Sequence, residues 1–213
     1  MALAYLLGKG SAKLLKVSLN TPLILVLSVI PDIDIIFDFL FKSEIHRGPT
    51  HSIIVAILVF VPFFVLCWQK AMPYFVALAS HSLIGDFLIG GQVQLLWPLS
   101  TSEFGLHESG FIYINIYNPI NITLEFTLFA IALIVMLKTR DLFKFFRNSK
   151  LNLILVIPIF TVLLPTFLGY PLSVPILLVV PHLFYLVLFS ASVLIIIVRI
   201  LNRQNGAVAS YSS

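Results

Sequence analysis

Histidine and carboxylate side chains recur in four short stretches of this 213-residue sequence. Each stretch lies within or beside an apolar segment, where an ionisable group usually faces a cavity, a partner or an ion. The only cysteine is Cys67, which excludes an internal disulfide and a cysteine-based zinc site. Imidazoles and carboxylates without thiolates suit zinc, or a mixed nitrogen and oxygen site for manganese or iron. The side chains concerned are Asp32, Asp34, His46, His51, His81, Asp86 and Glu125.

The first stretch is Pro31-Asp32-Ile33-Asp34. A proline suits the first turn of a helix and acids there complement the helix dipole, so a purely structural role is one reading. On a continuous helix, positions two apart point about 200° away from each other. Asp32 and Asp34 can therefore bind one ion only if Pro31 interrupts the helix. Asp38, four residues after Asp34, would share its face in a new helix and is a reserve candidate for a catalytic role.

The second stretch reads His-Arg-Gly-Pro-Thr-His-Ser from His46 to Ser52. Its Gly-Pro pair favours a turn, so both histidine rings can point to one place. Arg47 can bind an anionic group such as phosphate through its planar fork of donors. Thr50 is expected to cap the helix that begins near His51, and we expect it beside Arg47 in a substrate site. The alternative is an interfacial loop with one capping threonine and two solvated histidines.

His81 and Asp86, in the third stretch, are five residues apart, which is an offset of about 140° on an ideal helix. A π-bulge would bring the two side chains onto one face, and Gly85 is a suitable place for one. Without a bulge, one of the pair would hold a metal ligand from behind. Glu125 lies inside an apolar run and is a candidate ligand, general base or partner for Arg47.

The composition places these side chains in a membrane protein. Hydrophobic residues make up 60% of the chain and charged residues only 10%, with a mean hydropathy of +1.07. A soluble domain carries about 25% charged residues, so this chain could not cover a water-exposed surface. The net charge of +4 does not indicate nucleic-acid binding, because the basic residues stand beside apolar segments and form no single patch. Membrane lipids are the partners that this composition predicts.

Six segments are long enough, or nearly so, to cross a bilayer, which takes about 20 apolar residues. The sequence therefore predicts an all-α fold, a polytopic transmembrane bundle of about six membrane-embedded helices. Residues 1–16 are expected to form an interfacial helix or the start of a longer first span. The predicted segments are 17–41, 52–69, 72–90, 119–137, 151–169 and 172–199.

The distribution of lysine and arginine orients these segments. The loop 138–150 is rich in basic residues, which predicts that it lies in the cytoplasm. If the segments alternate in direction from this loop, the C-terminus also lies in the cytoplasm. Every basic residue except Lys42 and Arg47 then lies on that side. The histidine and aspartate stretches then fall in the outer half of a multi-pass protein of the cell (plasma) membrane.

Several strings of the sequence resemble a known family. They are the apolar run from Leu27 into Pro-Asp-Ile-Asp, the His46–Ser52 string, Ser80 to Asp86, and Leu-Leu-Trp-Pro-Leu at 95–99. In this order, over about the first 140 residues, the sequence resembles the YdjM-type family of predicted inner-membrane, metal-dependent hydrolases. That family is similar to the zinc phospholipase C and single-strand nuclease superfamily of helical enzymes. The resemblance implies, as metal ligands or their near neighbours, Asp32, Asp34, His46, His51, His81 and Asp86.

The resemblance also implies domains and an activity. It predicts a metal-dependent hydrolase-like membrane domain at 1–141, followed at 142–213 by two additional transmembrane helices and a short tail. A divalent metal, zinc first and manganese or iron otherwise, would lower the pKa of a bound water to near neutrality. Arg47 would stabilise the charge that develops on a phosphoester. By analogy, the substrate is a lipid or a lipid-linked phosphate at the extracytoplasmic face.

Two departures from the family pattern keep other functions open. Ala4-Tyr5 stand about where family members usually carry a histidine, and the His81–Asp86 spacing is five instead of four. Either departure could make the chain a catalytically degenerate structural or regulatory membrane protein. A divalent-metal carrier or sensor would also place histidine and aspartate in the membrane. A carrier should continue its ionisable groups towards the cytoplasmic side, where this sequence has almost none.

Overall fold

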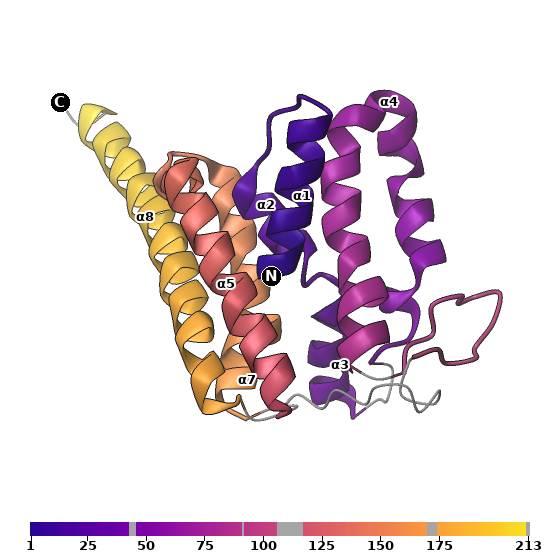
Figure 1. Ribbon diagram of the computed structural model, residues 1–213. Coiled ribbons are helices and arrows are strands. Elements are labelled where there is room, and N and C mark those ends of the chain that lie inside the picture. The colour runs from indigo at the N-terminus through magenta and orange to yellow at the C-terminus, as the bar shows by residue number, and fades with distance from the viewer. Residues whose placement is uncertain (43–45, 91, 106–116, 170–173, 212–213) are drawn as a thin grey trace.

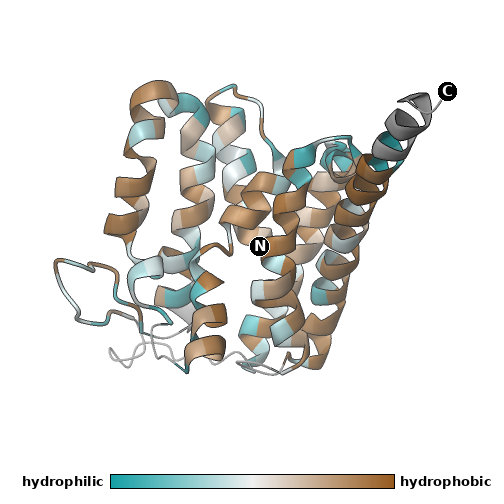
Figure 2. Ribbon diagram, turned by 180° about the vertical axis from the view of Figure 1, so that it is seen from behind, coloured by the Kyte–Doolittle hydropathy of each residue, from teal (hydrophilic) through white to brown (hydrophobic). Residues whose placement is uncertain are grey.

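The computed structural model describes residues 1–42, 46–90, 92–105, 117–169 and 174–211, which form a helical bundle (Figure 1). The predicted all-α fold is confirmed. An isolated bridge between Val93 and Phe104 is the only β pairing in the part of the chain that the structure describes. Figure 2 shows the long helices as hydrophobic over most of their length, as expected where lipid is the solvent.

The α-helices are joined by short 3-10 and π segments. The α-helices are α1 (Ala2–Leu14), α2 (Thr21–Leu27), α3 (Asp34–Phe41), α4 (Ile53–Ser80), α5 (Pro119–Lys138), α6 (Val156–Pro158), α7 (Leu164–Phe167) and α8 (Val179–Tyr211). The 3-10 segments are η1 (Pro31–Ile33), η2 (Pro49–His51), η4 (Asp141–Phe146), η5 (Lys150–Leu155) and η7 (Ile176–Leu178). The π segments are η3 (His81–Gly90) and η6 (Ile159–Leu163).

Among the described residues, 4 helical stretches are long and apolar enough to cross a membrane. Three of them coincide with the predicted segments 119–137, 151–169 and 172–199. The expected count of about six is not confirmed, because the first predicted segment is broken and the next two form one folded stretch. The stretches are Ile53–Phe87, Pro119–Lys138, Lys150–Phe167 and Ile176–Arg203.

The predicted segment 17–41 is not a continuous helix. Lys16 adopts a left-handed backbone conformation with φ of 54° just after α1. Asn20 then begins α2, since its side chain accepts a hydrogen bond from the backbone N–H of Leu23 at 3.0 Å. Pro31, which has no N–H to donate, begins η1 and does not prolong α2. Residues 1–16 therefore hold a separate short helix, α1, which buries Tyr5 inside the bundle.

The predicted segments 52–69 and 72–90 are two antiparallel arms of a hairpin. The backbone of Cys67 is non-helical, with φ of −158° and ψ of 53°, and the chain reverses there at the top of α4 (Figure 1). The rings of Phe60 and Phe64, before this bend, lie 5.5 and 5.2 Å from the ring of Phe75 after it. In a straight helix Phe60 and Phe75 would be about 22 Å apart.

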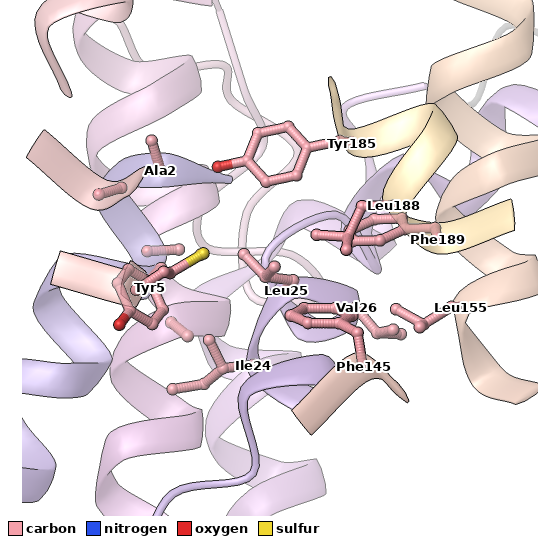
Figure 3. Close-up of a cluster of buried hydrophobic side chains, with 14 of the residues drawn as sticks. Ala2, Tyr5, Ile24, Leu25, Val26, Phe145, Leu155, Tyr185, Leu188 and Phe189 are labelled. Atoms are coloured by element: carbon pink, nitrogen blue, oxygen red, sulfur yellow. The ribbon is translucent and has the colours of Figure 1, made fainter. Parts of the chain in front are cut away.

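One buried apolar cluster joins the N-terminal and C-terminal helices (Figure 3). Ile24 and Leu25 of α2 are fully buried, and they lie between Tyr5 of α1 and the rings of Phe145 and Phe189. The rings of Phe145 and Phe189 stack with their centroids 5.8 Å apart. The predicted parts 1–141 and 142–213 therefore share a core.

A buried ionic cluster lies beside the connection between α5 and η4. The side chain of Asp141 is 1% exposed, and its Oδ2 accepts hydrogen bonds from the Tyr5 hydroxyl at 2.8 Å and the Thr139 hydroxyl at 2.9 Å. Lys9 donates to the same oxygen, and Nζ of Lys144 lies 2.7 Å from Oδ1. We call these five residues the Asp141 cluster. It ties α1 to the C-terminal half of the bundle and takes up the hydroxyl of Tyr5.

Basic residues gather at one end of the bundle. The end of α1, the bend of α4 and the connection between α5 and η4 all lie at the upper end in Figure 1. They carry Lys13, Lys70, Lys138, Lys144 and Arg147. The positive-inside rule makes this end the cytoplasmic one, which stays a prediction.

Candidate metal centre

Four side-chain atoms from three segments meet near the start of α3. Nε2 of His51 lies 3.5 Å from Oδ1 of Asp32 and 3.5 Å from Oδ2 of Asp86. Nε2 of His81 lies 3.2 Å from the same Asp32 oxygen and 3.5 Å from the same Asp86 oxygen. We call these four residues the four-residue centre. They belong to η1, η2 and η3, which are far apart in the sequence.

The spacing of these atoms fits a divalent cation. Nitrogen and oxygen ligands about 2.0–2.1 Å from a tetrahedral zinc ion lie about 3.3–3.4 Å from one another. The separations between histidine nitrogens and aspartate oxygens here run from 3.2 to 3.5 Å. Nε2 of His51, Nε2 of His81 and Oδ2 of Asp86 are buried with no hydrogen-bond partner among the described residues. Such atoms are rare in native structures, and a bound cation would satisfy all three.

Asp34 lies behind the centre and organises the histidine segment. Its Oδ1 lies 2.8 Å from Nδ1 of His46, and its Oδ2 lies 3.2 Å from Nδ1 of His51. The same Oδ2 accepts hydrogen bonds from the Thr50 hydroxyl at 2.5 Å and from the Arg47 backbone N–H at 3.3 Å. A carboxylate on Nδ1 fixes the ring and keeps the hydrogen on Nδ1 in the neutral form, so Nε2 of His51 presents its lone pair to the centre once its own proton has left. Asp34 is thus placed to position ligands.

His81 is oriented from behind in the same way. Its Nδ1 lies 2.8 Å from the backbone carbonyl oxygen of Ser28, which can only accept, so Nδ1 carries the hydrogen. Nε2 then presents its lone pair to the centre. Ser28 could not be predicted from its residue type, because it contributes a backbone carbonyl at the end of α2.

His46 lies at the edge of the centre. Its ring packs edge-on against the ring of His51, with centroids 5.2 Å apart. One ligand atom each from His46, His51 and Asp32 lies within 4.8 Å of the others, and the same holds for His51, His81 and Asp86. The two groups overlap at His51, which is fully buried.

Local breaks in helical geometry bring these residues together. Pro31 begins the 3-10 segment η1, which carries Asp32, and α3 begins at Asp34. Asp32 therefore faces the four-residue centre, whereas Asp34 lies behind it. The five-residue interval from His81 to Asp86 lies in the π-helix η3, where residues five apart share a face. The π geometry expected near Gly85 is therefore present.

Electrostatics couple the ionisable groups of η1 and η2. Burial lowers the pKa of His51, but the carboxylates of Asp32 and Asp34 outweigh it and raise the pKa to about 9. Burial raises the pKa of Asp32 and of Asp34, yet the neighbouring histidines hold both values well below their usual range. A metal that binds to His51 must therefore displace a proton that the carboxylates favour.

Arg47 and Asp38 lie next to the centre. Arg47 has a left-handed backbone with φ of 67°, and its Nε is buried without a hydrogen-bond partner in the described part of the chain. Its backbone N–H donates to Asp34 and its carbonyl accepts from the backbone N–H of Gln94 at 3.0 Å. Asp38 accepts a hydrogen bond from the backbone N–H of His46 at 3.0 Å, so it supports the loop.

Two expectations for individual residues differ from the structure. Thr50 does not cap the next helix, because η2 delays the start of α4 and the hydroxyl of Ser52 caps it instead. Thr50 bonds Asp34 and lies 3.0 Å from Nδ1 of His51. Glu125 is exposed on α5, and no hydrogen bond or ion pair joins it to Arg47 or to the centre among the described residues. The Ser52 cap could have been predicted, because a serine directly before a long apolar run is a typical helix N-cap.

The fold and the centre together define an integral membrane protein, all-helical, with buried histidines and aspartates at one end of its bundle. The model of the YdjM inner membrane protein family matches residues 1–205, so the chain belongs to that family. The match confirms the suspected family and covers both predicted parts of the chain. Comparison with curated proteins and with solved structures gave no match.

Proposed function

We propose that this protein is a membrane-embedded, metal-dependent hydrolase that cleaves a phosphoester of a lipid or lipid-linked substrate at the extracytoplasmic face. The observation that carries this proposal is the set of four ligand atoms in which each histidine nitrogen lies 3.2–3.5 Å from each aspartate oxygen; three of the four atoms are buried without a hydrogen-bond partner among the described residues. Zinc suits nitrogen and oxygen ligands at this spacing, and manganese or iron are the alternatives.

The protein's own residues would divide the work as follows. Asp32, His51, His81 and Asp86 would hold the ion, which supplies a water of lowered pKa and polarises a phosphoryl oxygen. Asp34 fixes the ring of His51 from behind, as Ser28 does for His81.

Arg47 would bind the phosphate. Its backbone is held between Asp34 and Gln94, and its buried Nε has a hydrogen free to donate. A guanidinium beside a metal-bound phosphoester would stabilise the charge that develops during hydrolysis. Replacement of Arg47 by lysine keeps the charge but removes the planar fork, so we expect activity to fall about tenfold or more.

The test is phosphate release by purified protein from a short-chain phosphatidic acid in detergent micelles, and from p-nitrophenyl phosphate. The proposal expects hydrolysis that a chelator abolishes and that added zinc, manganese or iron restores. His46→Ala and His81→Ala should remove it, whereas His182→Ala should retain it. His182 is a matched control because its ring lies in α8 and contacts the Leu178 carbonyl. Activity that survives both site substitutions would contradict the proposal.

A folded protein that binds metal and cleaves no phosphoester would instead favour a metal carrier or sensor. Metal flux into proteoliposomes separates these two, because a sensor moves no ion. A folded protein that binds no metal would favour a degenerate structural or regulatory role, and the first explanation would be the missing N-terminal histidine, about where Ala4-Tyr5 stand.

A further inference from the structure

Helix α3 begins beside the centre and then exposes an apolar surface. Its first residue, Asp34, is buried, whereas Leu40 is 63% exposed and Phe41 is 71% exposed. The rings of Phe37 and Phe41 stack with centroids 6.3 Å apart. A contiguous surface of this kind marks a contact with a membrane or a partner.

A second apolar projection is fixed to the histidine segment. It is the tip Leu96–Leu99 of the described segment 92–105, in which Leu99 is 82% exposed. The hydroxyl of Ser52 donates to the carbonyl of Trp97 at 2.6 Å, and the backbone N–H of Gln94 donates to the carbonyl of Arg47 at 3.0 Å. The Leu96–Leu99 tip is therefore held by residues next to His51, and α3 begins at Asp34, which lies behind the centre.

The first arm of α4, which starts beside this tip, is too short to cross a bilayer. Ile53–Leu66 rises about 21 Å, whereas the hydrocarbon layer is about 30 Å thick. The bend at Cys67 lies at the end of the bundle where the basic residues gather, which anchors that end at an interface. The start of α4 then lies about 9 Å below the opposite interface. Figure 1 shows this arm ending above the lower ends of α5 and α8.

The tip, which is bonded to the start of α4, lies at this depth among acyl chains, and α3 runs from there towards the lower ends of α5 and α8 (Figure 1). We propose that α3 and the Leu96–Leu99 tip form a lip in the outer leaflet, and that the substrate is a membrane-embedded amphiphile that enters sideways beneath this lip. The phosphate of the amphiphile would lie towards Arg47 and its acyl or isoprenoid chain against the lip. The substrate half of this inference rests on the proposed function, whereas the insertion of the lip does not.

Tryptophan fluorescence tests the insertion. The chain has two tryptophans, so Trp68→Phe leaves Trp97, in the lip, as the only one. In vesicles of phosphatidylcholine brominated near the middle of the acyl chain, we expect at least a twofold loss of Trp97 emission relative to unbrominated vesicles. A water-soluble quencher such as acrylamide should have little effect. Emission that acrylamide quenches and brominated lipid leaves unchanged would overturn the lip.

Substrate preference tests the entry route. Leu40→Ser and Leu99→Ser should lower the hydrolysis of phosphatidic acid in phosphatidylcholine vesicles about tenfold, and leave that of soluble p-nitrophenyl phosphate within twofold. Leu14→Ser is the matched control, because Leu14 is 84% exposed at the other end of the bundle. Equal losses on both substrates, or no loss on either, would overturn lateral entry.

The two failures can be told apart. If the wild type cleaves neither phosphoester, the proposed function and lateral entry both fail, and Trp97 quenching still decides whether the lip is inserted. If the wild type cleaves both and Trp97 is exposed to water, the hydrolase stands and the lip fails.

Discussion

Two clusters of charged side chains are buried in this bundle, and they are built differently. In the Asp141 cluster, one carboxylate receives two lysines and two hydroxyls, and both of its oxygens have partners. In the four-residue centre, two carboxylates face two imidazoles at 3.2–3.5 Å, and three of the four facing atoms have no hydrogen-bond partner within the described residues. The first cluster is complete as it stands.

The difference separates a structural ion pair from a binding site. Burying a charge costs free energy unless it is paired and hydrogen-bonded, and the Asp141 cluster meets both conditions. The centre meets neither fully, yet Asp34 and the Ser28 carbonyl hold its rings in one orientation. A cation site requires ligand atoms that are held in one orientation and have lone pairs without another partner. The predictions below use each cluster as the control for the other.

Removal of metal should have the largest effect. An ion bound a thousandfold above its dissociation constant stabilises the folded state by about 4 kcal/mol. We therefore expect a chelator to lower the free energy of unfolding of the wild type by about that amount in a denaturant titration in detergent. The double variant His51→Ala/His81→Ala should not respond to the chelator. An equal response of both proteins would place the metal elsewhere.

Asp141→Asn should come next. It leaves Lys9 and Lys144 without their shared counter-ion, and loss of one partner of a buried pair costs about 3 kcal/mol. The same titration measures this cost, and we expect it with and without a chelator. Folded Asp141→Asn protein should bind metal as the wild type does. Loss of metal from a folded Asp141→Asn variant would break the distinction between the clusters.

The contribution of Asp141 should also depend on pH. Burial raises its pKa, but Lys144, Lys9 and Tyr5 outweigh this and lower the pKa from 3.8 to about 2. A lowered pKa stabilises the fold above the unfolded value and is lost as the pH falls through the folded one. We expect about 2 kcal/mol of the difference between wild type and Asp141→Asn to vanish from pH 5 to pH 2. A difference independent of pH would show that charge is not its cause.

Asp34→Asn should have the smallest effect of the four. The amide can still accept one hydrogen bond but loses the charge that orients His46 and His51, and such supporting residues are worth about tenfold in metal affinity. Competition with a chelating dye measures the change. Complete loss of metal would make Asp34 a ligand, and no change would remove it from the site.

The sequence predicted much of the candidate site because its residues carry strong local signals. Pro31 predicts the break after α2 at which the segment with Asp32 and Asp34 begins, and the five-residue interval from His81 to Asp86 predicts π geometry. Both features are local properties of the backbone, set by one residue or by a fixed spacing. They can therefore be predicted without knowledge of tertiary contacts. The expected topology predicts that the histidine and aspartate stretches lie on one side of the membrane, but it does not predict which side chains contact one another.

Other features depend on packing and were not predictable. The hairpin bend at Cys67 interrupts a run in which hydropathy is high on both sides, so no polar break marks it. Hydropathy likewise cannot show that α1 ends before α2 or that Tyr5 bonds Asp141. The support of His81 by the Ser28 carbonyl leaves no trace in residue types. Glu125 was singled out by its apolar surroundings alone, and the structure does not join it to the centre.

The most direct test is the metal content of protein purified in detergent without chelators, measured by plasma mass spectrometry. The wild type and His182→Ala should each carry about one equivalent of zinc, manganese or iron, or more, per chain. The double variant His51→Ala/His81→Ala should carry none. Circular dichroism should show the same helix content in all three proteins. A folded wild type without metal, or equal metal in all three, would contradict the assignment of the four-residue centre as a cation site.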